Sequence, residues 1–404
     1  MQDRRWVLNP VGRHGLPWLT RTGCKQVLVM MDQIVSGTRL LDLLPLLEAD
    51  HRVQVVFTVP EPPESWHASH EFVEAQGGVV IPWSQARHLR FDLAVAAGQF
   101  GLDEIDAPVM LVPHGYGFGQ YRLRPRPAGD DRAAMMNLDR EQLMRDGRVR
   151  ADIVVLVHES EREILAQTCP EALHHVVVGG NIAFDRLMAS AGARERYRRA
   201  LKVPAHRNLV VVSSTWTSQS AFGRHPDLFE RIMDQLPSED YQVVGLLHPN
   251  IWSHHGRRQV RAWLDDCLRA GLGLVPPEEG WHAALIAADF VIGDYGSVTG
   301  YAAGLGTPVL LAAEPDDAPL KGSPAAALCD NAPRWQREQA LLPQLKKLAA
   351  NHTPDTHAEV RRRLTSRPGH AAAILRRTMY RLMDLPEPAR PACVCPVPPP
   401  RLVS

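Results

Sequence analysis

Residues 289–310, which read DFVIGDYGSVTGYAAGLGTPVL, decide the fold class of this chain. A continuous apolar run ends at Asp294, small residues fill 297–305, and Pro308 leads into a second apolar run. Uninterrupted apolar runs are typical of parallel strands that are covered on both faces, and small residues let a helix pack closely on such a sheet. The stretch therefore predicts a strand-helix-strand unit of an α/β protein.

The same alternation of apolar runs and amphipathic segments occupies most of the chain, in two rounds. Pro45 falls inside one amphipathic segment, 38–49, and is expected to kink or shorten that helix. Two rounds predict two doubly wound lobes with a ligand cleft between them. The predicted strands are 26–31, 53–59, 79–82, 92–97, 108–112, 152–157 and 174–178, then 208–213, 241–247, 272–275, 289–293 and 308–312. The other predicted helices are 67–76, 226–236, 256–270, 281–288, 297–305, 335–350, 357–366 and 370–384.

A polar, charged segment that is poor in strand formers separates the two rounds and is interpreted as a linker. The end of the chain is rich in proline, a composition that predicts disorder. The predicted divisions are an N-terminal lobe over 20–190, a linker over 191–207, a C-terminal lobe over 208–350, C-terminal helices over 351–385 and a disordered tail over 386–404.

The overall composition excludes several classes of function. The 45 basic and 45 acidic side chains cancel, so no global attraction for nucleic acid is expected. No apolar stretch is long enough to cross a bilayer, and the N-terminus lacks the apolar core of a signal peptide. The 6 cysteines form no CxxC pair, and no Asp/His cluster calls for a metal. We therefore expect a cytoplasmic protein with reduced thiols, no metal and no cofactor.

Four loops after predicted strands hold the residues that could carry chemistry. The first follows 108–112 and contains His114, with glycines at Gly115, Gly117 and Gly119. The unperturbed imidazole pKa of about 6.5 suits a general base near neutral pH, and the glycines allow close approach of a ligand. The alternative is a surface turn with an incidental histidine. The glycine spacing does not match the GxGxxG dinucleotide motif.

Two further loops contain a carboxylate and a histidine. Residues 179–187 place Asp185 in the first turn of a helix, where a mainly structural role is expected, with the loop lining the cleft. His248 precedes Pro249, which holds it in an extended conformation at a strand end. This imidazole could donate a hydrogen bond to a phosphate; the alternative is a capping or core histidine.

The fourth loop lies within 289–310, where the apolar run meets the small-residue helix. Unpaired N–H groups at a helix N-terminus, together with the hydroxyls of Ser297 and Thr299, predict an anion site. The alternative is that Ser297 is only the helix cap.

Taken in order, these loops resemble the CDP-glycerol glycerophosphotransferases of teichoic acid synthesis, which share the GT-B fold of many glycosyltransferases. The family's HG loop and HP strand end correspond to His114-Gly115 and His248-Pro249. The order agrees over about residues 108–312, and the other matching segments are Gly179 to Leu187, Ser213 to Trp216, Ala288 to Ser297 and Thr307-Pro308-Val309. The resemblance implies a GT-B-like α/β fold of two Rossmann-like doubly wound lobes. The acceptor would bind the N-terminal lobe and the nucleotide donor the C-terminal lobe.

The resemblance also implies roles for individual residues. His114 would take the proton of the acceptor hydroxyl, and His248 would be a second catalytic residue at the donor's phosphates. The donor phosphates would be bound by Gly115, Thr215, Asp294, Gly296, Ser297 and Thr299.

Two departures from the family pattern bear on the donor. Gly296 stands where the family has a serine, and the lysine that follows the family's HG loop is absent here. A weaker resemblance is to UDP-N-acetylglucosamine 2-epimerases, whose motifs are echoed by 178–181, His248-Pro249-Asn250 and 304–309. The acidic residue that those enzymes carry near the HG region is absent here.

The sequence thus predicts a transferase that moves a glycerophosphate or glycosyl group from a nucleotide-activated donor to an acceptor hydroxyl. The alternatives are a sugar-nucleotide 2-epimerase or hydrolase of the same fold, and a non-catalytic nucleotide-binding protein. A lipid-linked acceptor and a homo-oligomer are compatible with the sequence. The arginines of 361–363 and 376–381 are compatible with peripheral contact at the inner membrane face, or with a solvated basic face.

Overall fold

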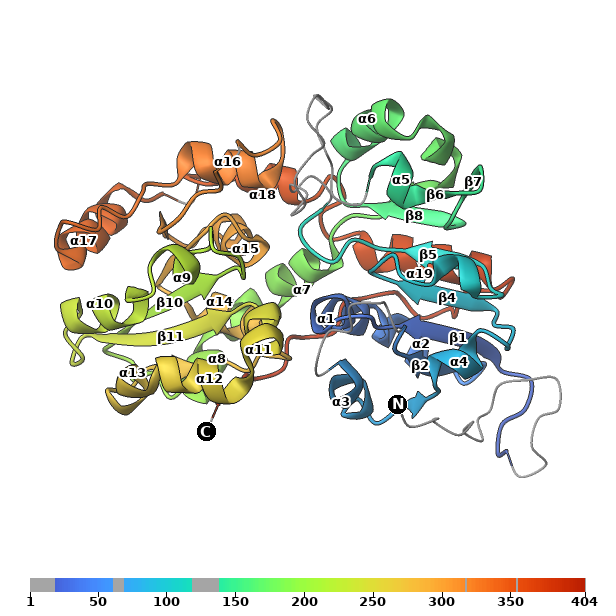
Figure 1. Cartoon of the computed structure of the whole chain (residues 1–404), viewed down its shortest axis with the longest axis horizontal. Coiled ribbons are helices and arrows are strands. Elements are labelled where there is room, and N and C mark those ends of the chain that lie inside the picture. Colours follow the sequence, from blue (N-terminus) through green and yellow to red (C-terminus); the bar gives the residue numbers. More distant parts are fainter. Residues whose placement is uncertain (1–18, 61–68, 118–137, 317, 354, 404) are drawn as a thin grey trace. The chain divides into compact units, whose positions relative to one another are not determined.

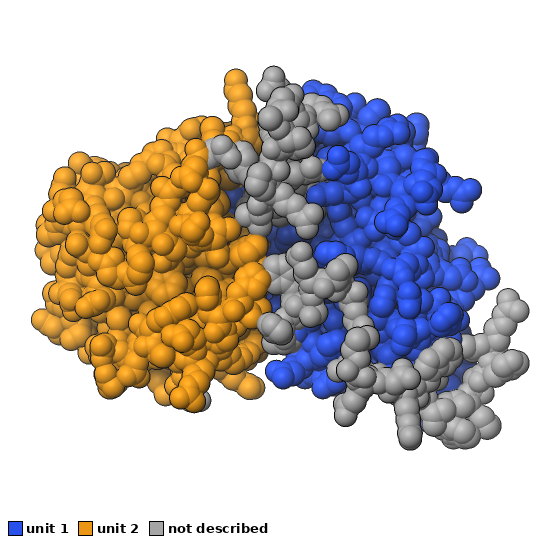
Figure 2. Space-filling model, in the orientation of Figure 1, with its two compact units in different colours: residues 1–122, 134–185, 366–395 blue, residues 123–133, 186–365, 396–404 orange. Residues whose placement is uncertain are grey.

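The computed structural model describes residues 19–60, 69–117, 138–316, 318–353 and 355–403. These residues form two compact units, which Figures 1 and 2 show in ribbon and space-filling form. Among the described residues, unit 1 holds those up to 117, 138–185 and 366–395, and unit 2 holds 186–365 and 396–403. Each unit contains its own parallel sheet and hydrophobic core.

Unit 1 is built on a seven-stranded sheet in the order β3-β2-β1-β4-β5-β8-β9, in which all paired strands are parallel. The central strands are buried along their length, as expected for strands covered on both faces. The strands are β1 (Lys25–Met30), β2 (Val53–Thr58), β3 (Val79–Val80), β4 (Leu93–Ala96), β5 (Val109–Leu111), β8 (Ile153–Leu156) and β9 (Val176–Val178). The helices are α1 (Ile34–Leu43), α2 (Pro45–Glu48), α3 (Ser69–Glu74), α4 (Trp83–Ala86), α5 (Arg140–Leu143), α6 (Glu159–Thr168) and α19 (Ala371–Leu382), with a hairpin of β6 (Met144–Arg145) and β7 (Arg148–Val149).

Unit 2 is built on a five-stranded sheet in the order β12-β11-β10-β13-β14, again with parallel pairs. Its strands are β10 (Asn208–Ser214), β11 (Tyr241–Leu247), β12 (Gly273–Leu274), β13 (Phe290–Gly293) and β14 (Val309–Leu311). Its helices are α8 (Arg194–Ala200), α9 (Ala221–Arg224), α10 (Leu228–Gln235), α11 (Pro249–His255), α12 (Arg257–Trp263), α13 (Asp265–Arg269), α14 (Trp281–Ala287), α15 (Ser297–Leu305), α16 (Pro324–Asn331), α17 (Leu341–Asn351) and α18 (Ala358–Leu364). The boundary between the units falls inside α7 (Ile182–Ser190).

The predicted α/β class and its strands are confirmed, because every predicted strand overlaps an observed one. Pro45 ends the first predicted helix as expected and occupies the first turn of α2, where its missing N–H costs nothing. The helix predicted at 335–350 begins later, at Leu341, because residues near Arg334 bridge to the sheet at Leu311 instead. α16 was not predicted.

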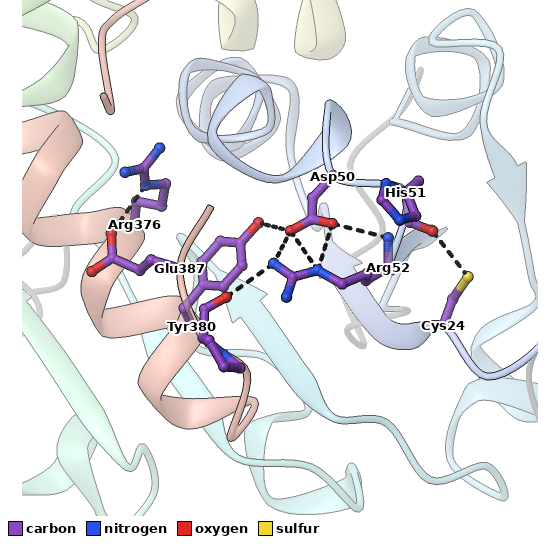
Figure 3. Close-up of polar contacts among 8 residues, drawn as sticks. Cys24, Asp50, His51, Arg52, Arg376, Tyr380 and Glu387 are labelled. Atoms are coloured by element: carbon purple, nitrogen blue, oxygen red, sulfur yellow. Dashed lines mark hydrogen bonds and ion pairs between the residues drawn. The ribbon is translucent and has the colours of Figure 1, made fainter. Parts of the chain in front are cut away.

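The C-terminal helix α19 belongs to unit 1 because side chains tie it to the end of α2 and the start of β2. The Tyr380 hydroxyl donates to Asp50 Oδ2 at 2.8 Å, and the Arg52 guanidinium binds the same carboxylate at 2.6 Å (Figure 3). Arg52 also donates to the Pro386 carbonyl oxygen at 2.9 Å. The hydrogen bonds from Arg52 hold the pKa of Asp50 well below its usual range.

Two predicted boundaries need correction. The expected linker 191–207 contains α8, and Arg198 is buried with a guanidinium bond to Asp289 at 2.7 Å. Its charged composition therefore reflects an ion pair inside unit 2. The tail expected to be disordered packs against the protein: Val397 is 2% exposed, and Val403 donates its N–H to the Leu274 carbonyl oxygen at 2.7 Å. Proline-rich composition misled the prediction because backbone bonds and apolar contacts order this segment.

Candidate active site

Asp294 ties together two loops at the carboxyl edge of the unit 2 sheet. It follows β13, which pairs with β10, and its carboxylate is 0% exposed. Oδ2 accepts three hydrogen bonds and Oδ1 accepts one; the donors are Thr215 N (2.8 Å), Thr215 Oγ1 (2.8 Å), Ala221 N (2.9 Å) and Gly296 N (3.0 Å). Burial raises the pKa of this carboxyl, and the four donors oppose that rise. Asp294 therefore holds the loops in place, and its burial leaves little of it for a ligand.

No side chain among the described residues caps the N-terminus of α15. Gly296 is the N-cap residue, with φ −69° and ψ 161°, and Ser297 is the first helical residue. The alternative prediction that Ser297 serves as the cap is therefore wrong. The first N–H groups of a helix have no partner within it, so this end can accept an anion. Ser297 is half-buried at this point.

Gly296 is required by the side chain of Thr215. A Cβ atom added at position 296 would lie 2.4 Å from Thr215 Cγ2 and 3.0 Å from Asp294 Oδ1. The methyl group of Thr215 thus fills the space that a serine would need. The departure from the family's Asp-Tyr-Ser-Ser pattern has a packing reason, since Thr215 is fixed by its own bonds to Asp294.

Thr299 is the third residue of α15, and its side chain is 0% exposed. Its Oγ1 has no hydrogen-bond partner among the described residues and would lie 2.3 Å from a Cβ at Gly293. The hydroxyl therefore faces the end of β13. Thr299 and Ser297 therefore differ in their surroundings, although the sequence predicted that both hydroxyls belong to one anion site.

His248 follows β11, and its backbone N–H donates to the Ser214 carbonyl oxygen at 3.0 Å. Its Nδ1 accepts the N–H of Asn250 at 3.1 Å, which makes it the N-cap of α11. An accepting Nδ1 places the proton of the neutral ring on Nε2, the tautomer that can donate to an anion. The ring stacks on Trp216 at a centroid distance of 6.1 Å. The capping alternative is confirmed, and the tautomer that capping fixes suits the predicted phosphate contact.

His114 follows β5 in unit 1. Its Nδ1 lies 3.1 Å from the Ala97 carbonyl oxygen, an atom that only accepts, so Nδ1 carries the proton. Nε2 of the neutral ring then carries the lone pair and can act as a base. Arg39 Nε donates to the His114 carbonyl oxygen at 3.2 Å and fixes the loop. Burial lowers the pKa of the imidazole, which favours the neutral form.

Asp32 is a functional candidate that the sequence reasoning missed. It lies just after β1, is 4% exposed, and accepts a hydrogen bond from Ser36 Oγ at Oδ1. A Cβ at Gly98 would lie only 2.0 Å from Asp32 Oδ2. Burial raises the pKa of this carboxyl, and its electrostatic interaction with His114 lowers it. The available signal was a carboxylate directly after a buried strand, the same pattern as Asp294.

Asp32 and His114 line one cavity of unit 1, with a volume of about 770 Å³. Ser36, Gly98 and Arg150 also line it. Strands β1, β4 and β5 are neighbours in the sheet, so the loops that follow them meet at the same edge. Ligands of open parallel sheets bind at this edge.

Two other predicted residues fall elsewhere. Asp185 is 6% exposed and accepts the N–H groups of Gly369 (2.8 Å) and Ala371 (3.0 Å), so that it caps α19. This supports the expected structural role. Gly115 belongs to unit 1, beside His114, and not to the unit that holds the other predicted phosphate ligands. Gly119 lies outside the described residues.

No family model matches the sequence, and no curated protein matches it. Solved structures of the wall teichoic acid polymerase TagF are similar in fold. TagF itself gives a TM-score of 0.59 at 12% identity, over 90% of this chain and 90% of that chain. A TagF variant soaked with CDPG gives a TM-score of 0.60 at 11% identity, over 89% of each chain. The fold is of the GT-B type.

A putative UDP-N-acetylglucosamine 2-epimerase from Listeria monocytogenes has the same GT-B type of fold. It gives a TM-score of 0.54 at 16% identity, over 91% of this chain and 99% of that chain. Both proteins that the sequence resembles therefore share this architecture. No described helix is long and apolar enough to span a membrane. Among the described residues no group of three or more His, Cys, Asp or Glu side chains could hold a metal ion.

Proposed function

We propose that this chain is a GT-B-type transferase that moves a glycerophosphate or glycosyl group from a nucleotide-activated donor to an acceptor hydroxyl. The observation that carries the proposal is the tautomer of His114. Its Nδ1–H is held by the Ala97 carbonyl oxygen, which leaves Nε2 as the basic nitrogen, and His114 lines a cavity of about 770 Å³. Unit 1 would bind the acceptor in this cavity.

Unit 2 would bind the donor. The N-terminus of α15 offers backbone amides that no described side chain caps, and Ser297 adds a hydroxyl. His248 presents the tautomer that donates from Nε2. Such groups stabilise the negative charge that develops on the leaving nucleotide without a metal ion. TagF, which shares the fold, has been soaked with CDPG, and the epimerases act on UDP-N-acetylglucosamine, so a cytidine or uridine diphosphate compound is the donor class to test first.

A second candidate function is favoured by the pairing of Asp32 with His114. Burial raises the pKa of the carboxyl and lowers that of the imidazole. Two such groups in one cavity could move protons on a single substrate, as an epimerase or a hydrolase requires. A non-catalytic nucleotide-binding protein is the third candidate, and Gly296 in place of serine favours it.

One experiment separates these candidates. Calorimetric titration with CMP, UMP, CDP and UDP measures nucleotide binding, while CDP-glycerol and UDP-N-acetylglucosamine are tested for consumption with and without glycerol. Consumption that depends on glycerol supports the transferase. Epimer or free sugar formed without an acceptor identifies the second candidate. Nucleotide binding without consumption identifies the third, and the absence of both overturns the proposal.

A further inference from the structure

Asp32 and His114 contact adjacent residues at the end of β4. His114 Nδ1 binds the carbonyl oxygen of Ala97, and Asp32 Oδ2 lies so close to Gly98 that no side chain fits there. The two groups thus come from the ends of β5 and β1 and meet at the strand that lies between them in the sheet. This places a buried carboxylate and the proposed base in the lining of one cavity.

The protein fixes the orientation of the Asp32 carboxylate. Ser36 Oγ donates to Oδ1, and the Asp32 backbone is held by Ser69 Oγ, which donates to its carbonyl oxygen at 3.2 Å. Ser36 Oγ in turn accepts the N–H of Gln33 at 3.1 Å. A buried carboxylate that is held in this way keeps its position when a neighbouring charge appears.

Two charged side chains act on His114 with opposite sign. The carboxylate of Asp32 favours the imidazolium, and the guanidinium of Arg39 disfavours it. Arg39 is paired with Asp42 at 3.8 Å, which offsets part of its charge. The other charged residues that line the cavity are Asp103, Glu104, Glu141, Arg145, Asp146 and Arg150. Of these, Asp103 binds Arg150 at 2.6 Å and Glu104 binds Arg87 at 2.8 Å, so their charges are compensated.

We propose that the carboxylate of Asp32 stabilises the imidazolium that forms when His114 accepts a proton. This rests on the proposed function. In that reaction the acceptor oxygen bonds to the phosphorus or carbon of the transferred group, and the bond to the nucleotide breaks. The nucleotide leaves with the electron pair, and the acceptor proton moves to Nε2 of His114. A fixed anion beside the ring lowers the energy of the charge that this transfer creates.

The first test does not require activity. The imidazole titration of His114 is followed by NMR in the full chain, and its signal is assigned by its loss in His114→Asn. In Asp32→Asn the midpoint should move to lower pH, because the carboxylate that favours the charged ring is gone. Asp92→Asn is the matched control: Asp92 lies before β4, at the opposite edge of the same sheet, and binds Lys25. Its substitution should leave the midpoint unchanged.

A second variant covers a failure of Asp32→Asn to fold. Gly98→Ala keeps both ionisable groups but places a methyl 2.0 Å from Asp32 Oδ2, which must move away. The His114 midpoint should change, because the interaction between the two groups depends on their separation. An unchanged midpoint in a folded variant of either kind overturns the proposal, as does an equal shift in Asp92→Asn.

The second test uses turnover with whichever donor is consumed. Asp32→Asn should lower kcat at least tenfold, leave the KM of the donor unchanged, and move the acidic limb of the kcat/KM profile to lower pH. An unshifted limb contradicts the proposal. If neither CDP-glycerol nor UDP-N-acetylglucosamine is consumed by the unmodified protein, the proposed function fails, while the NMR titration still decides whether Asp32 controls the protonation of His114.

Discussion

Asp32 in unit 1 and Asp294 in unit 2 each follow a buried parallel strand, and both carboxyl groups have raised pKa values because they are buried. Their surroundings differ. Asp294 accepts four hydrogen bonds from Thr215, Ala221 and Gly296. Asp32 accepts a side-chain bond from Ser36 and lines a cavity beside a histidine. One carboxylate thus organises backbone, and the other is left to act on a neighbouring ionisable group.

This difference teaches that a carboxylate at a strand end is not by itself a sign of catalysis. The surroundings distinguish the two cases: the donors to Asp294 come from two separate loops, whereas Asp32 lines a cavity together with a histidine. We expect substitutions around Asp294 to act mainly on the stability of unit 2, and substitutions around His114 to act mainly on chemistry.

The largest effect on stability is expected from Asp294→Ala. The substitution leaves four buried donors without their acceptor, which should cost about 3–5 kcal/mol of unfolding free energy. Urea denaturation of the variant measures this. Asp316→Ala is the control, because Asp316 is 63% exposed and pairs only at the surface with Arg224, so its loss should change stability by less than about 0.5 kcal/mol. Equal costs for the two variants would contradict the role of Asp294.

The second prediction concerns pH. His357 is 1% exposed, and neither ring nitrogen has a hydrogen-bond partner among the described residues. Burial lowers its pKa to about 4, from an ordinary value of 6.5. Between these values the unfolded chain binds the proton and the folded chain does not. Above pH 6.5 His357 should therefore leave the free energy of unfolding unchanged. As the pH falls toward 4, it should lower the free energy of unfolding by up to about 3 kcal/mol.

His357→Leu removes this titration. The slope of unfolding free energy against pH between about 4 and 6.5 should be smaller in the variant than in the unmodified protein, as followed by urea denaturation at several pH values. Identical slopes would show that the buried ring does not titrate in this window. His357 belongs to unit 2 and His114 to unit 1. The comparison of the two units is therefore sharpened if low pH destabilises unit 2 while His357→Leu leaves the pH dependence of turnover unchanged.

The third prediction tests the packing of residue 296 against Thr215. Gly296→Ser introduces a Cβ 2.4 Å from Thr215 Cγ2 and should cost about 1–3 kcal/mol, since Thr215 is held by Asp294. Thr215→Ser in the same chain removes the methyl group and keeps the hydroxyl bond to Asp294. Thermal denaturation should show that the double variant recovers most of the lost stability. If the stability losses of Gly296→Ser and Thr215→Ser simply add in the double variant, contact with the Thr215 methyl group is not the reason for glycine at position 296.

The smallest effect on stability is expected from Ser297→Ala, because Gly296 and not Ser297 is the N-cap. Nucleotide affinity should nevertheless fall by roughly ten- to a hundredfold, as for a lost hydrogen bond to a charged oxygen. Calorimetry with the nucleotide that binds best, beside a melting curve, gives both values. A lowered melting temperature with unchanged affinity would remove Ser297 from the donor site.

The sequence predicted the strands of both sheets because continuous apolar runs bounded by turn residues are a local signal. It could not predict which strands are neighbours. Asp32 follows β1 and His114 follows β5, and these two strands are far apart along the chain. In the sheet both strands are neighbours of β4, which brings the two residues to the same edge. The sequence shows that Gly296 stands where the family has a serine. It does not show the reason, which is the position of the Thr215 methyl group.

Composition alone misled the prediction in two segments. The charged composition of 191–207 suggested a linker, whereas Arg194 and Arg198 of α8 both bind Asp289, directly before β13. The prolines after residue 385 suggested disorder, whereas Tyr197 donates to the Val397 carbonyl oxygen at 2.8 Å. Both contacts join residues distant in sequence, which local composition does not encode.

The central claim is that His114 is the base, and His114→Asn tests it most directly. The asparagine amide can keep the bond to the Ala97 carbonyl oxygen while the basic Nε2 is lost. Turnover of the consumed donor and affinity for the corresponding nucleotide are measured on the same preparation. We expect turnover to fall by about 10²–10⁴-fold, with nucleotide affinity unchanged. Turnover that persists, or affinity that falls in parallel with turnover, would contradict the assignment of His114 as the base.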